Sequence, residues 1–140
     1  MSNPSLLPDA EYEIMLIVWS RPAPITSMQV AAIACPENNW KSQTVLTLLG
    51  RLAQRGFLQS EKRGNELFHT PLVSRDDYLK KETGLFMEKF HKNSITGLMS
   101  ALYAESSPTE SELSELEQWF KERAERINPS PAKEKERSEQ

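Results

Sequence analysis

The sequence predicts a mainly α-helical protein with one small β-hairpin: a winged helix-turn-helix followed by a C-terminal helical dimerisation region. Three observations predict it: an amphipathic helix with a second, polar face, a strand–turn–strand pattern directly after that helix, and renewed helical periodicity after residue 73. We expect residues 1–73 to form the winged-helix DNA-binding domain, residues 74–127 the dimerisation domain and residues 128–140 a disordered tail.

Residues 42–56 form the predicted helix around which the rest of the chain is organised. Ser42 can cap the N-terminus of a helix there, and Gly56 stands where a C′ glycine would end it. Between them, apolar residues recur at i, i+3, i+4 and i+7 and form one buried stripe, which consists of Val45, Leu48, Leu49 and Leu52.

The opposite face of this helix carries the functional signal. Thr44, Thr47 and Arg51 share that face, and Gln43 lies beside them on the first turn. Ser42, at the start of the helix, is also an expected DNA contact. Short hydroxyl and amide side chains near a helix N-terminus, followed by an arginine, suit base edges and phosphates in a major groove. Taken alone, however, the helix is better explained as an ordinary amphipathic surface helix.

The residues before this helix predict two more helices. Asp9 can cap the first, which stops before Pro22. Ile25 lies between turn signals and can make a brief strand contact. A Thr-x-x-Gln capping box that begins at Thr26 opens the second helix, and Pro36 is expected to end it.

After Gly56 the periodicity changes to that of strands. Residues 57–62 and 66–70 read as short strands joined by a basic, glycine-containing tip, which fits a hairpin and completes the order of a winged helix. In that fold the third helix enters the major groove and the wing rides on the adjacent backbone. Winged helices also serve as protein–protein modules. The expected wing contacts are Lys62, Arg63, Gly64 and Asn65.

Charge is distributed unevenly along the chain. The net charge of the 140 residues is −3, which by itself argues against nucleic acid. Residues 41–63 nevertheless carry five basic residues and one acidic residue, whereas residues 73–140 carry fourteen acidic and eleven basic. The positive charge therefore gathers around the proposed reading helix, beginning with Lys41, as an electrostatic footprint would.

The C-terminal part reads as three helices. Ser74 can cap the first, Asn93 and Ser94 break it, and a capping box that begins at Ser107 opens the last. A helical hairpin of this size cannot bury its apolar side by itself, so we expect that side to meet a second subunit; the alternative is that it folds back as monomeric core. The expected dimer contacts are Leu98, Leu102, Leu113, Leu116 and Phe120.

The remaining features argue against catalysis, cofactors and metals. Cys35 is the only cysteine, so an intrachain disulfide is excluded and a reducing compartment is indicated. His69 and His91 lack a partner at metal-ligand spacing, and no carboxylate pair stands in a catalytic setting. With no signal-peptide pattern and no membrane-length apolar stretch, we expect a cytoplasmic protein that is not an enzyme.

These motifs together resemble the BlaI/MecI family of penicillinase and methicillin-resistance repressors. The resemblance covers roughly residues 7–127 and is carried by Asp-Ala-Glu at 9–11, by the run Thr-Val-Leu-Thr-Leu-Leu-Gly-Arg-Leu at 44–52, and by Phe-His-Thr-Pro at 68–71 followed by Tyr78. It implies a homodimeric repressor that binds a palindromic operator and controls β-lactamase-like resistance genes. It also implies a membrane sensor protease that cleaves the repressor within the dimerisation region.

Three departures from the family pattern stand out. Gln43 replaces an expected lysine and Leu46 an often polar residue, so base preference differs, since lysine favours guanine and glutamine adenine. Ala101-Leu102 stands at the position of the family's Asn-Phe cleavage bond, so the resemblance does not carry cleavage over by residue match. The C-terminal cysteine cluster of related copper-responsive repressors is missing.

The sequence thus leaves two hypotheses from different classes. The first is a dimeric winged-helix repressor that binds double-stranded DNA. The second is a winged-helix protein-interaction module without DNA binding, whose contact surface would be the acidic C-terminal half.

Overall fold

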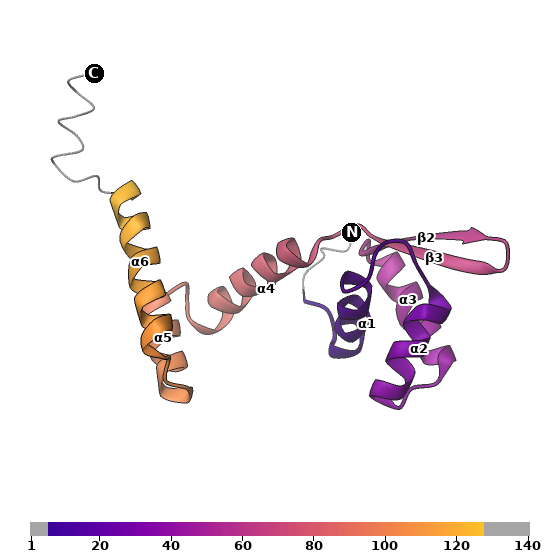
Figure 1. Cartoon of the computed structure of the whole chain (residues 1–140), viewed down its shortest axis with the longest axis horizontal. Coiled ribbons are helices and arrows are strands. Elements are labelled where there is room, and N and C mark those ends of the chain that lie inside the picture. The colour runs from indigo at the N-terminus through magenta and orange to yellow at the C-terminus, as the bar shows by residue number, and fades with distance from the viewer. Residues whose placement is uncertain (1–5, 128–140) are drawn as a thin grey trace, which may run out of the picture. The chain divides into compact units, whose positions relative to one another are not determined.

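The computed structural model describes residues 6–127, which form two compact units, one ending at Asn93 and one beginning at Ser94. The expected tail, residues 128–140, lies outside the described residues. The first unit contains α1 (Asp9–Trp19), β1 (Ile25–Thr26), α2 (Ser27–Asn38), α3 (Ser42–Gln54), β2 (Leu58–Arg63), β3 (Glu66–Pro71) and α4 (Arg75–Phe90). The second contains α5 (Ile95–Glu105) and α6 (Glu110–Ile127), as Figure 1 shows. This order confirms the predicted winged helix with added C-terminal helices.

α4 belongs to the same compact unit as the winged helix, because Tyr78 in its first turn is buried there. The boundary expected after residue 73 separates DNA binding from dimerisation, not one compact unit from another. It stays a prediction.

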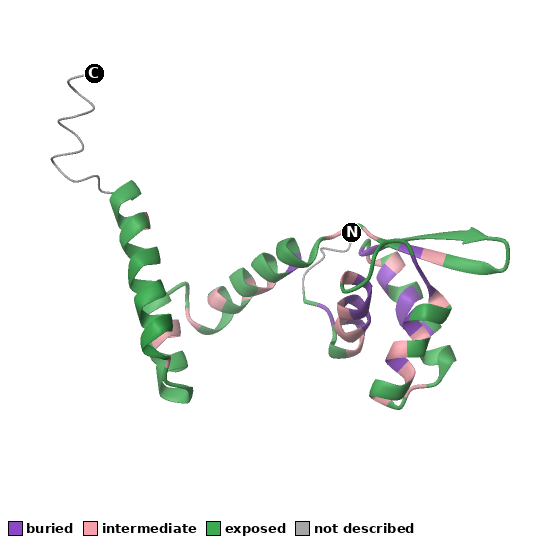
Figure 2. Ribbon diagram, viewed as in Figure 1, coloured by how far each residue is buried: buried purple, intermediate pink, exposed green. Residues whose placement is uncertain are grey.

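The core of the first unit lies between α1, α2 and α3, where buried residues gather in Figure 2. The apolar stripe expected on α3 is fully confirmed, since all four of its residues are at most 5 % exposed. Burying a stripe of this width is what holds a short helix in place, because isolated helices of this length are marginal in water. The facing residues from α1 and α2 are Ile14, Met15, Ile17, Val18, Val30 and Ala34.

The small sheet has the strand order β1-β3-β2, with both pairings antiparallel. The brief strand expected at Ile25 is confirmed, since it pairs with His69 of β3. At the far end, Arg63 pairs with Glu66, which leaves a two-residue turn. Gly64 takes φ +62 in that turn, the left-handed value that a hairpin turn with glycine at its first position requires. The β2–β3 hairpin thus projects beyond the helices as a wing (Figure 1).

The expected helix boundaries are partly wrong. Asp9 lies inside the first turn of α1, because Pro8 already holds the extended backbone of an N-cap. Pro36 does not end α2, which continues to Asn38. Proline at an interior position removes one N–H donor, but this does not stop the helix so near its C-terminus. The helix ends two residues later, and Asn39 follows it in the left-handed conformation. The last helix is capped by Thr109, whose hydroxyl accepts from the Glu112 N–H, and not by Ser107.

Two expected caps are confirmed. The side chain of Thr26 accepts from the Gln29 N–H, and the Gln29 side chain accepts from the Thr26 N–H, so the capping box is complete. Ser74 accepts from the Asp77 N–H and opens α4.

Tyr78 joins the start of α4 to the winged helix. Its ring lies 5.7–5.8 Å, centroid to centroid, from the rings of Tyr12, Trp19 and Phe57, and it is almost completely buried. Its hydroxyl accepts a hydrogen bond of 2.9 Å from the backbone N–H of Leu7. Burial raises the pKa of Tyr78 to about 12, and nearby Glu82 acts in the same direction.

The pKa of Tyr78 gives a test of this packing. The neutral phenol stabilises the folded unit fully below pH 10, the value for an ordinary tyrosine, and this contribution is lost as the pH rises through about 12. We expect the free energy of unfolding to fall by roughly 2 kcal/mol over that window. Tyr78→Phe removes the titrating group and should lack this component, as urea unfolding at several alkaline pH values would measure. Identical pH dependence of the two proteins would contradict the assignment.

Candidate nucleic-acid interface

The outward face of α3 is the centre of the candidate interface. Every α3 residue that the sequence placed on this face is exposed, whereas the opposite stripe is buried. The hydroxyl, amide and guanidinium groups therefore point to solvent from a helix whose position is fixed by its core contacts. These exposed residues are Gln43, Thr44, Thr47 and Arg51.

The N-terminus of α3 differs from the expectation. Ser42 is the first helical residue and not the cap, because Lys41 has the extended backbone of the N-cap and its carbonyl accepts from Thr44 and Val45. Lys41 provides no side-chain cap. The N–H groups of Ser42 and Gln43 thus begin α3 next to an exposed lysine, an arrangement that suits a phosphate.

Thr47 is less free than its sequence position suggests. Its hydroxyl donates to the carbonyl oxygen of Gln43, 3.0 Å away, one turn earlier in α3. The donor is thus used within the helix, and the oxygen lone pair and the methyl group remain for a partner. Thr47 is suited to accept a hydrogen bond from a base amino group or to contact an apolar base edge.

Arg55, whose side chain is 41 % exposed, is paired with an acidic partner inside the fold. Its Nε lies 3.0 Å from Oε1 of Glu11, a buried carboxylate in the first turn of α1. The contact is an ion pair, not an aligned hydrogen bond. A buried carboxylate without a counter-charge is strongly destabilising, so this pair links α1 to the C-terminal end of α3. Arg55 therefore helps to fix the position of α3 against α1.

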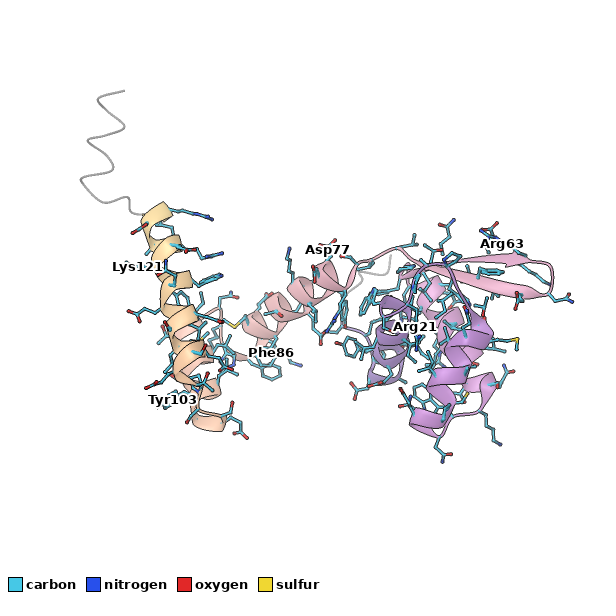
Figure 3. All side chains as sticks on the ribbon, viewed as in Figure 1. Arg21, Arg63, Asp77, Phe86, Tyr103 and Lys121 are labelled. Carbon is cyan, nitrogen blue, oxygen red and sulfur yellow. The ribbon has the colours of Figure 1, made fainter. Side chains whose placement is uncertain are left out.

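The wing carries its basic residues at the tip. Lys62, Arg63, Gly64 and Asn65 are all exposed, and Figure 3 places Arg63 on the projecting hairpin. The Arg63 guanidinium lies 3.1 Å from the Glu61 carboxylate and 5.1 Å from the centre of the Phe68 ring. Because both groups of this ion pair are more than half exposed, the pair is weak and water-screened, and a phosphate can compete for the guanidinium.

His69 ties the base of the wing to the helices. Its Nε2 lies 2.8 Å from the Ser27 hydroxyl at the start of α2, and its Nδ1 lies 2.8 Å from the Ser60 hydroxyl in β2. The ring is buried, and this burial lowers the pKa of His69 below the ordinary value of 6.5. Both ring nitrogens of His69 therefore have a serine hydroxyl as partner within the fold.

The structure also brings forward residues that the sequence reasoning left out of the site. Gly50 and Gln54 are exposed on the outward face of α3, and Leu46, noted only as a departure, is 45 % exposed beside them. Counting 100° per residue from Gln43 would have found all three, because they fall on the side opposite the buried stripe.

No group of three or more metal-binding side chains is placed to share an ion within residues 6–127. The same residues include no helix with the length and apolar character needed to cross a bilayer.

Known proteins match this arrangement. The family model described as penicillinase repressor matches residues 7–122. The chain belongs to the penicillinase repressor family. The BlaI/MecI resemblance of the sequence is thereby confirmed.

Individual members of the penicillinase repressor family align over most of the chain. The penicillinase repressor of Bacillus licheniformis is 25 % identical over 81 % of this chain and 88 % of its own length. The methicillin resistance regulatory protein MecI of Mammaliicoccus sciuri is 27 % identical over 76 % of this chain and 86 % of its own length. The solution structure of the DNA binding domain of the repressor BlaI superimposes with a TM-score of 0.50 at 29 % identity, covering 56 % of this chain and 94 % of that one.

His69 makes the stability of this family member sensitive to acid. Because the folded-state pKa lies below 6.5, the neutral ring stabilises the fold above pH 6.5, and this contribution is lost as the pH falls through the folded value. His69→Gln should therefore lose less stability than the unmodified protein between pH 7 and pH 5 in urea unfolding. His91→Gln, which replaces the other histidine, is the matched control for the loss of an imidazole. An unchanged pH dependence in His69→Gln would refute this role.

Proposed function

We propose that this chain is a cytoplasmic, homodimeric transcriptional repressor whose winged helices bind the two halves of a palindromic operator. α3 lies in the major groove, with Gln43, Thr44 and Thr47 at base edges. The wing follows the neighbouring phosphates. Half-sites are then separated by about one turn of DNA or a multiple of it.

The observation that carries the proposal is the outward face of α3. A rigid helix, buried along one stripe, presents uncharged hydrogen-bonding groups at its centre and Arg51 at its flank. Uncharged acceptors and donors read bases, whereas cations hold phosphates. Membership of the penicillinase repressor family supports the same assignment.

Phosphate contacts come from both ends of the surface. Lys41, with the first-turn N–H groups of α3, provides one cluster, and Lys62, Arg63 and the backbone at Gly64 and Asn65 provide the other. Arg51 lies between them on α3. These cations give the domain a local positive surface although the whole chain carries −3.

Exposed apolar side chains in the second unit support dimerisation. Leu102, Leu113, Leu116 and Phe120 are 38–51 % exposed, and Leu98 is half-buried. A groove of about 700 Å³ between α5 and α6 is lined by Leu102, Leu113 and Leu116. Exposed apolar surface of this kind marks an interaction site, and a second copy would cover it.

The proposed repressor also implies a set of controlled genes and an inducing signal. Control of β-lactamase-like resistance genes and release by a membrane sensor protease are carried by the family alone. The Ala101–Leu102 bond lies inside α5 and is exposed. A protease would have to unwind that helix before it could accept the bond in extended form.

Arg51→Ala tests the repressor. We would measure fluorescence anisotropy of the full chain against promoter fragments, including its own upstream region, over a salt series. We expect tight, steeply salt-dependent binding to one palindromic fragment, and a loss of about tenfold or more in Arg51→Ala, since one phosphate contact is removed from each half-site. Arg51→Lys should recover part of this loss if Arg51 holds a phosphate as a point charge.

Arg21→Ala is the matched control, because it removes an equal charge from the same unit outside the predicted surface. Flat, equally weak binding of the unmodified protein to every fragment would reject the repressor and leave a protein-interaction module.

Leu116→Asp combined with Phe120→Asp tests the dimer. Two carboxylates on the apolar side of α6 should leave the protein monomeric in sedimentation equilibrium, because burying them unpaired is costly. The monomer should lose most of its affinity for the full operator and keep weak binding to a half-site. Ser111→Asp, on a polar part of the same helix, should stay dimeric. A dimer that survives the double substitution would place the interface elsewhere.

A further inference from the structure

Gly50 is a helix-interior glycine that the fold itself does not explain. It lies in α3, four residues before the last, and it is exposed. A Cβ added at this position would meet no atom within 4 Å, so no neighbour requires glycine. Its φ is not in the left-handed region, in contrast to the φ of +85 at Gly56 and +62 at Gly64. Glycine here only weakens the helix relative to alanine.

Gly50 lies close to the centre of the outward face of α3. At 100° per residue it falls within about 20° of Gln43, on the side opposite the buried stripe. The residues around it, Leu46, Thr47 and Gln54, are all exposed and uncharged. The charged Arg51 lies at the flank of this face. An uncharged centre with a charged flank fits the floor of a groove, where base edges lie between two rows of phosphates.

We propose that Gly50 is the point at which the backbone of α3 comes closest to the base pairs, and that the missing side chain sets how deeply the helix enters the groove. This inference rests on the proposed function. Any side chain at position 50 would hold the helix away from the floor and lengthen the base contacts of Gln43 and Thr47 together. The glycine thereby acts as a positioning residue for sequence readout.

The test is Gly50→Ala compared with Gly84→Ala. Gly84 is the matched control, because it too is an exposed, helical glycine, in α4, whose added Cβ would meet nothing within 4 Å. Both substitutions should raise the melting temperature, each by roughly 4 °C, because alanine favours helix. Only Gly50→Ala should weaken binding to the operator fragment found for the unmodified protein, by at least about tenfold, equivalent to the loss of one base contact.

Two further measurements show whether operator binding weakens because α3 enters the groove less deeply or for another reason. Binding to a random duplex at low salt, and the salt slope on it, should be unchanged in Gly50→Ala, because phosphate contacts are kept. Gly50→Leu should weaken operator binding more than Gly50→Ala, since the larger side chain holds the helix further out. Sedimentation equilibrium should show that all variants assemble as the unmodified protein does.

The outcomes are distinct. A more stable Gly50→Ala protein with at least tenfold weaker operator binding supports the proposal. Operator affinity within about twofold of the unmodified protein, or a lowered melting temperature, overturns it. If the unmodified protein selects no fragment, the repressor function itself fails. If it selects one and Gly50→Ala selects it equally well, only the role of Gly50 fails.

Discussion

The packing of Tyr78 is the constraint on which the arrangement of the first unit depends. One side chain from the first turn of α4 fills the space between α1 and the start of the wing, and its hydroxyl holds the backbone at Leu7. Trp19 adds a second tie, since its indole N–H donates to the Val73 carbonyl just before α4 begins. Because both ends of the winged helix are closed by the same aromatic cluster, the chain leaves the domain from a fixed point. Beyond this first turn, α4 exposes most of its side chains (Figure 2).

Local patterns could be predicted from the sequence, and long-range partners could not. The stripe of α3, the hairpin around Gly64 and the Ser74 cap each depend on residues within one or two turns, so spacing and residue type decide them. Ser42 failed as a cap because the choice between two adjacent residues depends on one backbone angle at Lys41. The partners of His69 are 42 and 9 residues away, and no periodicity pairs residues at such distances.

The candidate site shows the same division. Helical spacing placed the hydroxyl and guanidinium groups correctly on one exposed face. It could not show that the Thr47 hydroxyl donates into its own helix, or that Arg55 is held by buried Glu11. Both findings reduce the number of groups on the outward surface that a nucleic acid could contact. The Thr47 hydroxyl is no longer available as a donor, and the Arg55 guanidinium is already paired with a carboxylate. The sequence overcounted the groups available to a nucleic acid because it could not show which are used within the fold.

The cations that remain give a physical reason why the proposed repressor would need two copies of the chain. With Arg55 engaged, the cations of the surface are Lys41, Arg51, Lys62 and Arg63, on a chain whose net charge is negative. Few phosphate contacts mean low affinity for DNA of any sequence, and such contacts carry no sequence information. In the proposed function, the uncharged centre of α3 would supply the discrimination between sequences, but over only a few base pairs. A single winged helix of this kind would bind weakly wherever it met its short site. In the proposed dimer, linking two of them through the apolar helices of the second unit would raise the effective concentration of the second contact, so that affinity and selectivity would both come from the spacing of two half-sites.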